Sequence, residues 1–259
     1  MLDKTSFAIE THHLAKTFST QAGAIHLFKD LSLNIQQGES VAIIGQSGAG
    51  KSTLLSLLAG LDEPTSGTVK LMETDLNQLS DAARSTWRST NLSFIFQAFH
   101  LLPELTALEN VQLPLDIRGD KQASQQAARL LGKVGLSDRQ DHYPAQLSGG
   151  EQQRVAIARA FVTAPSILFA DEPTGNLDAQ TGENIITQLF DINEQQATTL
   201  ILITHDAALA SRCNRQFRLE QGMLIEGLSE ARAEGLSEAR AEGPNDTINK
   251  GSNVEAVKD

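Results

Sequence analysis

The chain has 259 residues, 40% of them hydrophobic, which is enough for one large domain or two modest ones with a sizeable core. Its formal net charge of −11 argues against broad nucleic-acid binding, because that function needs a basic face. The single cysteine, Cys213, excludes an internal disulfide framework and suits a reducing compartment.

Neither a targeting segment nor a membrane span is predicted. The first ten residues lack a cationic region followed by an apolar run, so we expect no signal peptide. The longest apolar runs, such as residues 199–203, are strand-sized and fall well short of the roughly 20 residues that a spanning helix requires.

The first part of the chain, residues 6–35, predicts strands separated by a polar loop near Gly23. Phe18 precedes that loop. An aromatic side chain here could stack on an adenine ring or pack in the core, and the sequence leaves both options open.

The run VAIIGQSGAGKST, residues 41–53, predicts a short buried strand, a glycine-rich turn and the start of a helix. Gly45, Gly50, Lys51 and Ser52 satisfy the phosphate-loop pattern G-x-x-x-x-G-K-[ST]. Glycines let the backbone wrap a polyphosphate, and N–H groups at a helix start attract anions. Lys51 would contact the β- and γ-phosphates, and the Ser52 hydroxyl would ligate Mg²⁺.

We therefore expect this loop to bind ATP. The alternative, a glycine-rich turn with a surface lysine, is disfavoured by the complete pattern. The residues predicted to contact the nucleotide here are Gly45, Gln46, Ser47, Gly48, Ala49, Gly50, Lys51, Ser52 and Thr53.

Next come a strand at residues 67–72, an amphipathic helix near 80–88 and a buried strand at 92–97. The last strand ends in Gln97. Ligands of parallel sheets bind at the carboxyl ends of the strands, so Gln97 could contact Mg²⁺ or the attacking water. An ordinary surface glutamine is the alternative.

Residues 98–163 predict an inserted helical subdomain, punctuated by Pro103 and Pro114. Its last helix opens with LSGGEQQ, in which Ser148 and Glu151 form a capping box. Glycines at positions 149 and 150 weaken a first helical turn, which favours a close approach of the backbone to a ligand. A serine with free N–H groups at a helix start is a second candidate anion-binding end.

A continuous apolar strand at residues 166–173 ends in two carboxylates, Asp171 and Glu172. Asp171 could hold Mg²⁺ through water, and Glu172 could polarise a water for attack on the γ-phosphate. The alternative is a carboxylate pair that caps the next turn. Asp178 is a plausible N-cap of the following helix.

Another buried strand, residues 198–204, is followed by His205, which could donate to the γ-phosphate or cap a helix at 206–212. A hairpin is predicted at residues 215–225.

The octapeptide GLSEARAE then occurs twice in tandem, at 227–234 and 235–242. Eight residues are too few for a solenoid unit, so we expect residues 227–259 to form a disordered tail.

Taken together, the motifs resemble those of ABC-transporter ATP-binding subunits over about residues 6–226. The matching pieces are GQSGAGKST (Walker A), Gln97 (Q-loop), LSGGEQQ (the family motif), ILFADEP (Walker B), Asn176 to Asp178 (D-loop) and His205 (switch histidine). This resemblance implies an α/β fold: a P-loop NTPase core with an N-terminal antiparallel β subdomain and the helical subdomain inserted at about 98–163. Phe18 falls where the family places its adenine-stacking aromatic residue.

The resemblance also implies a site shared by two subunits that sandwich two ATP molecules. The Walker A loop of one would face Ser148, Gly149 and Gly150 of the other. In this scheme Glu172 is the general base, Gln97 and His205 sense Mg²⁺ and the γ-phosphate, Asp171 holds Mg²⁺, and Asp178 couples the two sites.

Finer features, FQAFHLLPELTALENVQLPL and FADEPTGNLDAQTG, are similar to the branch that pairs with FtsX-like permeases, including macrolide-exporter, lipoprotein-release, cell-division and YbbA-like ATPases. The expected function is an ATP-hydrolysing homodimer on the cytoplasmic face of the inner membrane, powering such a permease. A soluble ABC ATPase acting on nucleic acid or ribosomes is the alternative. The single cassette, the lack of sustained heptads and the acidic balance disfavour it. LSGGEQQ argues against an ordinary P-loop kinase or GTPase.

Overall fold

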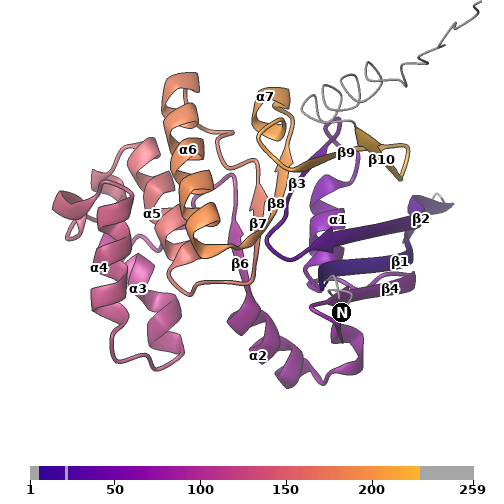
Figure 1. Ribbon diagram of the computed structural model, residues 1–259, viewed down its shortest axis with the longest axis horizontal. Coiled ribbons are helices and arrows are strands. Elements are labelled where there is room, and N and C mark those ends of the chain that lie inside the picture. Colours follow the sequence, from indigo (N-terminus) through magenta and orange to yellow (C-terminus); the bar gives the residue numbers. More distant parts are fainter. Residues whose placement is uncertain (1–5, 21–22, 228–259) are drawn as a thin grey trace, which may run out of the picture. The chain divides into compact units, whose positions relative to one another are not determined.

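The computed structural model describes residues 6–20 and 23–227 (Figure 1). The predicted tail therefore lies outside the described residues, apart from Gly227, which ends the last strand. Within this part of the chain, no helix is both long enough and apolar enough to cross a membrane.

A six-stranded sheet in the order β10-β9-β3-β8-β7-β6 forms the centre of the fold. All neighbours are parallel except β10, which pairs antiparallel with β9 at the edge. Parallel strands expose their carboxyl ends at one edge of the sheet, so the residues that follow these strands gather there. The strands are β3 (Ser40–Ile44), β6 (Leu92–Ile95), β7 (Ile167–Asp171), β8 (Thr199–Thr204), β9 (Arg215–Glu220) and β10 (Met223–Gly227).

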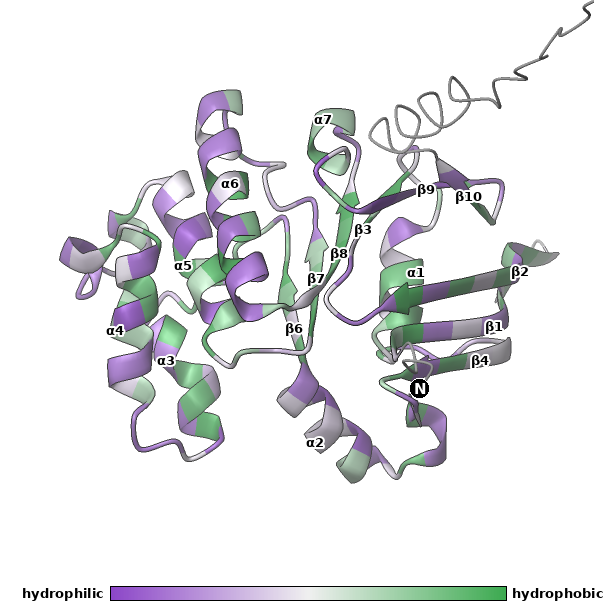
Figure 2. Cartoon of the chain, viewed as in Figure 1, coloured by the Kyte–Doolittle hydropathy of each residue, from purple (hydrophilic) through white to green (hydrophobic). Residues whose placement is uncertain are grey.

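Two hydrophobic clusters cover the two faces of this sheet, because successive side chains of a strand point to opposite faces. On β7, Leu168 and Ala170 join one cluster, whereas Ile167 and Phe169 join the other. The central strands are correspondingly apolar between their ends (Figure 2), as buried parallel strands require.

An antiparallel sheet in the order β2-β1-β4-β5 and helix α1 (Lys51–Leu58) complete one cluster. This sheet is the predicted N-terminal β subdomain, and its first two strands form a long hairpin in which Thr20 lies opposite Gly23. The strands are β1 (Phe7–Thr20), β2 (Gly23–Gln36), β4 (Ser66–Leu71) and β5 (Thr74–Asp75).

Helices form the other cluster, on the opposite face of the six-stranded sheet (Figure 1). They are α3 (Ala107–Ile117), α4 (Ala123–Lys133), α5 (Gly149–Phe161) and α6 (Ala179–Gln196), with the short α7 (Ala207–Ala210) beside them. The polar α2 (Asp81–Asn91) contains no fully buried residue. Short 3-10 turns occupy Leu76–Gln78, Ser137–Arg139 and Pro144–Gln146.

Two local predictions need correction. The strand predicted at residues 92–97 ends at Ile95, so Gln97 lies in the loop that follows. Pro114 does not interrupt a helix but lies inside α3. A proline removes one helical hydrogen bond, but burial of Ala107, Val111 and Leu115 on the same helix offsets that loss.

Asn110 ties the loop before α3 to this helix. Its side chain is fully buried, and its Oδ1 accepts from the N–H of Leu102 at 2.8 Å. Its Nδ2 donates to the carbonyls of Leu102, Leu105 and Thr106 at 3.0–3.1 Å. The carbonyls of Leu102 and Thr106 also accept from the backbone N–H groups of Leu105 and Asn110. The amide is therefore an additional tie between the loop and the helix.

Replacing this amide should destabilise the protein strongly. We expect Asn110→Ala to lower the free energy of unfolding by roughly 2–4 kcal/mol, because the loop loses the four hydrogen bonds of a fully buried amide and a cavity is left in its place. Gln112→Ala is the control on the same helix, since Gln112 bonds only the exposed Asp116 carboxylate and should cost about 0.5 kcal/mol or less. Urea unfolding measures both, and equal losses would contradict the role of Asn110.

Candidate functional site

The phosphate loop joins the carboxyl end of β3 to the start of α1. Gly48 and Gly50 have positive φ angles of 79° and 94°, which glycine adopts at little cost. Gly50 is the N-cap of α1, and no side chain caps this helix. The first N–H groups of α1 therefore have no side-chain partner and are available to an anion.

Lys51 folds back along this loop. Its Nζ donates to the carbonyl of Gly45 at 2.7 Å and to that of Gln46 at 3.1 Å. These carbonyl bonds hold the ammonium group at the loop, where phosphate oxygens can replace them. The loop thus combines backbone donors with a cation, as polyphosphate binding requires.

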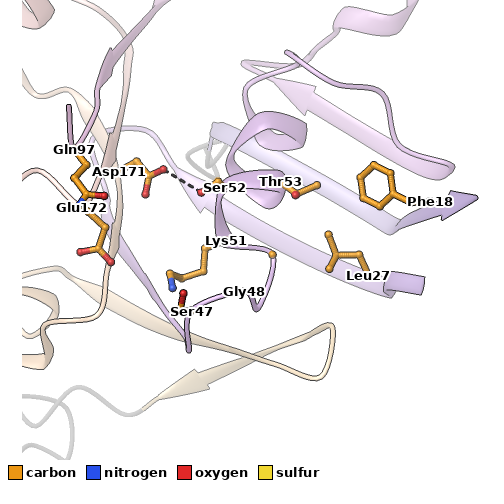
Figure 3. A pocket seen from close by; sticks show the side chains of 11 residues that line it. Phe18, Leu27, Ser47, Gly48, Lys51, Ser52, Thr53, Gln97, Asp171 and Glu172 are labelled. Atoms are coloured by element: carbon orange, nitrogen blue, oxygen red, sulfur yellow. Dashed lines mark hydrogen bonds between the residues drawn. The ribbon is translucent and has the colours of Figure 1, made fainter. Parts of the chain in front are cut away.

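A pocket of about 550 Å³ opens in front of the loop, within the usual range of roughly 300–1,000 Å³ for ligand sites. Figure 3 shows Gln97, Asp171 and Glu172 on one side of Lys51 and Ser52, and Phe18 and Leu27 on the other. The lining residues are Phe18, Leu27, Ser47, Gly48, Gly50, Lys51, Ser52, Thr53, Gln97, Asp171 and Glu172. All except Leu27 were predicted site residues. Gln46 and Ala49 border a neighbouring hollow, and Gly45 packs against Leu219.

Phe18 is 42% exposed on β1, opposite Ile25 of β2. This exposure excludes the core-packing option that the sequence left open. The Nζ of Lys16 lies 5.2 Å from the centroid of the ring, within cation–π distance. An aromatic face at the rim of the pocket fits a nucleobase, and its stacking on adenine stays a prediction.

Asp171 and Ser52 meet beside the phosphate loop. The Ser52 hydroxyl donates to Oδ2 of Asp171 at 3.2 Å. Burial raises the pKa of Asp171 above its ordinary value, and the hydrogen bond from Ser52 opposes that rise. Both groups present oxygen atoms, the ligand type that Mg²⁺ prefers.

The described residues contain no group of three or more histidine, cysteine, aspartate or glutamate side chains that could hold a metal ion. Magnesium usually keeps several waters and binds through one or two carboxylates plus substrate phosphates. Ser52 and Asp171 next to a phosphate loop fit that mode of binding.

Glu172 has a strained backbone, with a φ angle of 47° that costs a non-glycine residue of the order of 1–3 kcal/mol. Its N–H still donates to the carbonyl of Ile203 at 2.9 Å, which continues the pairing with β8. Its two carboxylate oxygens lie 2.8 and 2.9 Å from Nδ1 of His205. The structure thus joins the two residues predicted to act on the attacking water and the γ-phosphate.

Gln97 lies close to the turn that follows Glu172. Its backbone carbonyl accepts a hydrogen bond from Nδ2 of Asn176 at 2.8 Å. A Cβ at Gly175 would come within 2.8 Å of its Nε2, so only glycine fits there without a shift. Direct contact therefore links the Gln97 loop and the turn after β7.

Ser148 starts α5 with the predicted capping box. Its hydroxyl accepts from the N–H of Glu151, and Glu151 accepts from the N–H of Ser148 at 2.8 Å. A Cβ at Gly150 would approach Thr181 to 2.6 Å, so packing of α5 against α6 explains this glycine. Gly149 is exposed and a Cβ there would make only an ordinary contact at 3.5 Å. None of Ser148, Gly149 and Gly150 lines the pocket of the same chain.

Asp178 is the N-cap of α6, as predicted, and accepts from the N–H of Thr181 at 3.0 Å. With His205 it borders a second hollow of about 550 Å³ between α6 and α7. Like Ser148, it stands outside the phosphate pocket. Most of the predicted residues therefore line or border the phosphate pocket, whereas Ser148, Gly149, Gly150 and Asp178 lie outside it.

Sequence reasoning missed several contacts around the site. Gln153 of α5 donates to the carbonyl of Pro173, and Arg159 donates to the carbonyls of Phe99 and His100 at 2.8 and 2.6 Å. These residues lie far apart in the sequence from their partners. Gln153 is the last residue of the LSGGEQQ motif, but nothing in the sequence indicates its bond to Pro173, and Arg159 occupies an ordinary polar position of the helix.

Comparison with known proteins agrees with this geometry. The model of the ABC transporter family matches residues 28–175. The uncharacterized ABC transporter ATP-binding protein YbbA of Escherichia coli K12 is 50% identical over 220 residues, covering 84% of this chain and 96% of YbbA. The lipoprotein-releasing system ATP-binding protein LolD of Bordetella avium is 47% identical over 222 residues, covering 85% and 96%.

Among solved structures, the dimeric ATP-binding cassette MJ0796, in a post-hydrolysis state bound to ADP and phosphate, superposes with a TM-score of 0.77. It is 39% identical, and the match covers 85% of this chain and 97% of that cassette. The chain therefore belongs to the ABC transporter ATP-binding family, with the predicted P-loop NTPase fold. Within the family it is an ATP-binding and ATP-hydrolysing subunit of the YbbA and LolD type.

Because of the capping box of α5, we expect the free energy of unfolding to fall as the pH is lowered through the acidic range. Hydrogen bonds from the N–H and hydroxyl of Ser148, with a contribution from Arg139, lower the pKa of Glu151 to about 2. A lowered carboxyl pKa stabilises the fold above the ordinary value near 4.5, and this stabilisation is lost as the pH falls toward 2.

We expect Glu151→Gln to be less stable than the wild type by a constant amount from pH 7 to pH 5.5, and by a smaller amount at pH 3.5. Urea unfolding at these three pH values tests this. Glu194→Gln, which removes a carboxylate from α6, is the control. A deficit for Glu151→Gln that is unchanged at pH 3.5 would show that the lowered pKa contributes nothing.

Proposed function

We propose that this chain works as a homodimer that hydrolyses Mg²⁺–ATP on the cytoplasmic face of the inner membrane and powers an FtsX-like permease. The observation that supports this most directly is the gathering of Phe18, Lys51, Gln97, Asp171 and Glu172 around one pocket. The motifs of the FtsX-like branch and the similarity to LolD, named as part of a lipoprotein-releasing system, support the choice of partner.

Binding of ATP would use the features of the phosphate loop. The free N–H groups at the start of α1 and the ammonium group of Lys51 would take the phosphates, while Phe18 would stack on the adenine. Ser52, Asp171 and Gln97 would hold Mg²⁺. When bound, this ion neutralises charge on the β- and γ-phosphates.

Hydrolysis would use Glu172 as the general base. Its carboxylate takes a proton from a water molecule, and the water oxygen forms a bond to the γ-phosphorus. The bond between the γ-phosphorus and the bridging oxygen of ADP breaks, so that ADP and phosphate leave. His205, bonded to both oxygens of Glu172, fixes the direction of the carboxylate and would reach the γ-phosphate.

A second copy of the chain would complete the site. Ser148 and Gly149 are exposed at the start of α5 and stand outside the pocket of their own chain. A helix start with an exposed serine and glycine suits the γ-phosphate of an ATP bound to a partner. Asp178, also exposed and outside the pocket, would couple the two sites. The dimer would close when ATP binds and open after hydrolysis. These changes would move the helical subdomain, which would pull on the permease.

The alternative, an ATPase acting on nucleic acid or ribosomes, gains no support from the comparisons. YbbA and LolD, the two relatives reported above, carry names of transporter subunits. The net charge of −11 also opposes a large basic interface.

Replacing the base should separate binding from hydrolysis. We expect Glu172→Gln to bind ATP with wild-type affinity, to lose hydrolysis by at least about a hundredfold, and to form a dimer that ATP holds closed. Lys51→Ala should instead bind ATP weakly and stay monomeric. Nucleotide titration, phosphate release and size-exclusion chromatography with ATP measure these properties. Wild-type hydrolysis by Glu172→Gln would contradict the assignment of the base.

The same variant can identify the partner. With ATP present, Glu172→Gln used as bait in detergent-solubilised membranes should recover a permease with a large extracytoplasmic domain. A Lys51→Ala bait shows which proteins depend on bound nucleotide. Recovery of ribosomes or nucleic acid without a membrane protein would overturn the transport role while leaving the ATPase chemistry in place.

A further inference from the structure

Gln153, the last residue of the LSGGEQQ motif, is a fully buried polar residue that has no role in the ATPase mechanism proposed above. It lies on α5, one turn after Gly149 and Gly150. Its Nε2 donates to the carbonyl of Pro173 at 2.5 Å, and Pro173 directly follows Glu172. A single side chain therefore joins the helix that starts at Ser148 to the turn that carries the proposed base.

Glu172 needs such support because its backbone is held in the left-handed region, with φ at 47°. A strained residue keeps its conformation only where neighbouring contacts fix it. On the N-terminal side of the strained residue, the N–H of Glu172 donates to the carbonyl of Ile203 in β8. On its C-terminal side, the N–H of Gly175 donates to the carbonyl of Glu172 at 3.0 Å, and the amide of Gln153 donates to the carbonyl of Pro173.

The amide at position 153 is poorly explained by stability alone. Its Oε1 is buried and has no hydrogen-bond partner among the residues described. A buried polar atom without a partner destabilises a fold. An apolar side chain of similar size would avoid this defect, so the bond to Pro173 is the feature that the amide adds.

We propose that Gln153 is a positioning residue for Glu172: its hydrogen bond to the Pro173 carbonyl holds the strained turn that directs the carboxylate toward the attacking water. This proposal rests on the proposed function, in which Glu172 is the base. It also gives α5 a direct link from its first turn, where the partner's ATP would bind, to the backbone of the base.

Gln153→Met tests the proposal, because it keeps the volume and removes both the donor and the unpartnered oxygen. We expect kcat for ATP hydrolysis to fall about tenfold or more while KM for ATP stays within about threefold, since the base is misplaced but the phosphate loop is intact. The thermal midpoint should stay close to that of the wild type, because the lost bond and the removed oxygen offset each other.

Gln196→Met is the matched control. Gln196 also donates to a backbone carbonyl, that of Phe161 at 3.3 Å, and also has a buried Oε1 without a partner in the described part of the chain. It lies at the end of α6, away from the pocket lining. This variant should keep wild-type kcat, with rates normalised to the protein that binds ATP.

A second variant changes Pro173, the residue whose carbonyl accepts the hydrogen bond from Gln153. Pro173→Ala keeps the carbonyl but frees the backbone after Glu172, and it should lower kcat with little change in KM even where Gln153→Met folds poorly. Wild-type kcat in either folded variant would overturn the proposal. So would a loss of thermal stability with unchanged kcat, which would make Gln153 a structural residue only.

Failure of this proposal is distinguishable from failure of the proposed function. An inactive Glu172→Gln beside an active Gln153→Met would reject the positioning role and keep the base. An active Glu172→Gln would reject the base, whatever Gln153→Met does.

Discussion

Helix α1 begins without a side chain to cap it, and the rest of the site depends on this. The N–H groups at its start would be satisfied in most helices by a serine, threonine or aspartate. Here the N-cap is Gly50, in a left-handed conformation, and the ammonium group of Lys51 donates hydrogen bonds to two loop carbonyls. Donors and cation are thus assembled before any phosphate binds, so little reorganisation is needed on binding.

The parallel sheet brings the other groups to this helix start. Because β3, β6, β7 and β8 point the same way, their carboxyl ends meet at one edge of the sheet. Asp171 ends β7, Glu172 and His205 directly follow β7 and β8, and Gln97 lies in the loop after β6. Helix α5 connects this edge to the helical subdomain. It starts at the exposed Ser148, contacts Pro173 through Gln153 and ends near Arg159, whose guanidinium holds the loop after Gln97. Movement of α5 would therefore reach both loops of the proposed site.

Local patterns predicted the elements and most of the residues that line the pocket, because the relevant signals lie close together in the sequence. The phosphate loop, the strand that ends at Asp171 and the capping box at Ser148 are such cases. Predictions were less accurate where distant packing decides. Helix α3 continues past Pro114 because one of its faces is buried. Position 150 is a glycine because a Cβ there would collide with Thr181 of α6. Gln153 and Asn176 bond to backbone groups of remote loops, which no local pattern encodes.

In the proposed dimer, one chain holds the phosphate loop of a site and a second copy completes it through Ser148 and Gly149. Mixing two inactive variants, Lys51→Ala and Ser148→Arg, tests this arrangement most directly. In a mixed dimer one site carries both defects and the other carries neither, so mixing should restore ATP hydrolysis that neither variant shows alone. A mixture that remains as inactive as its components, although mixed dimers form, would contradict a site shared between two copies.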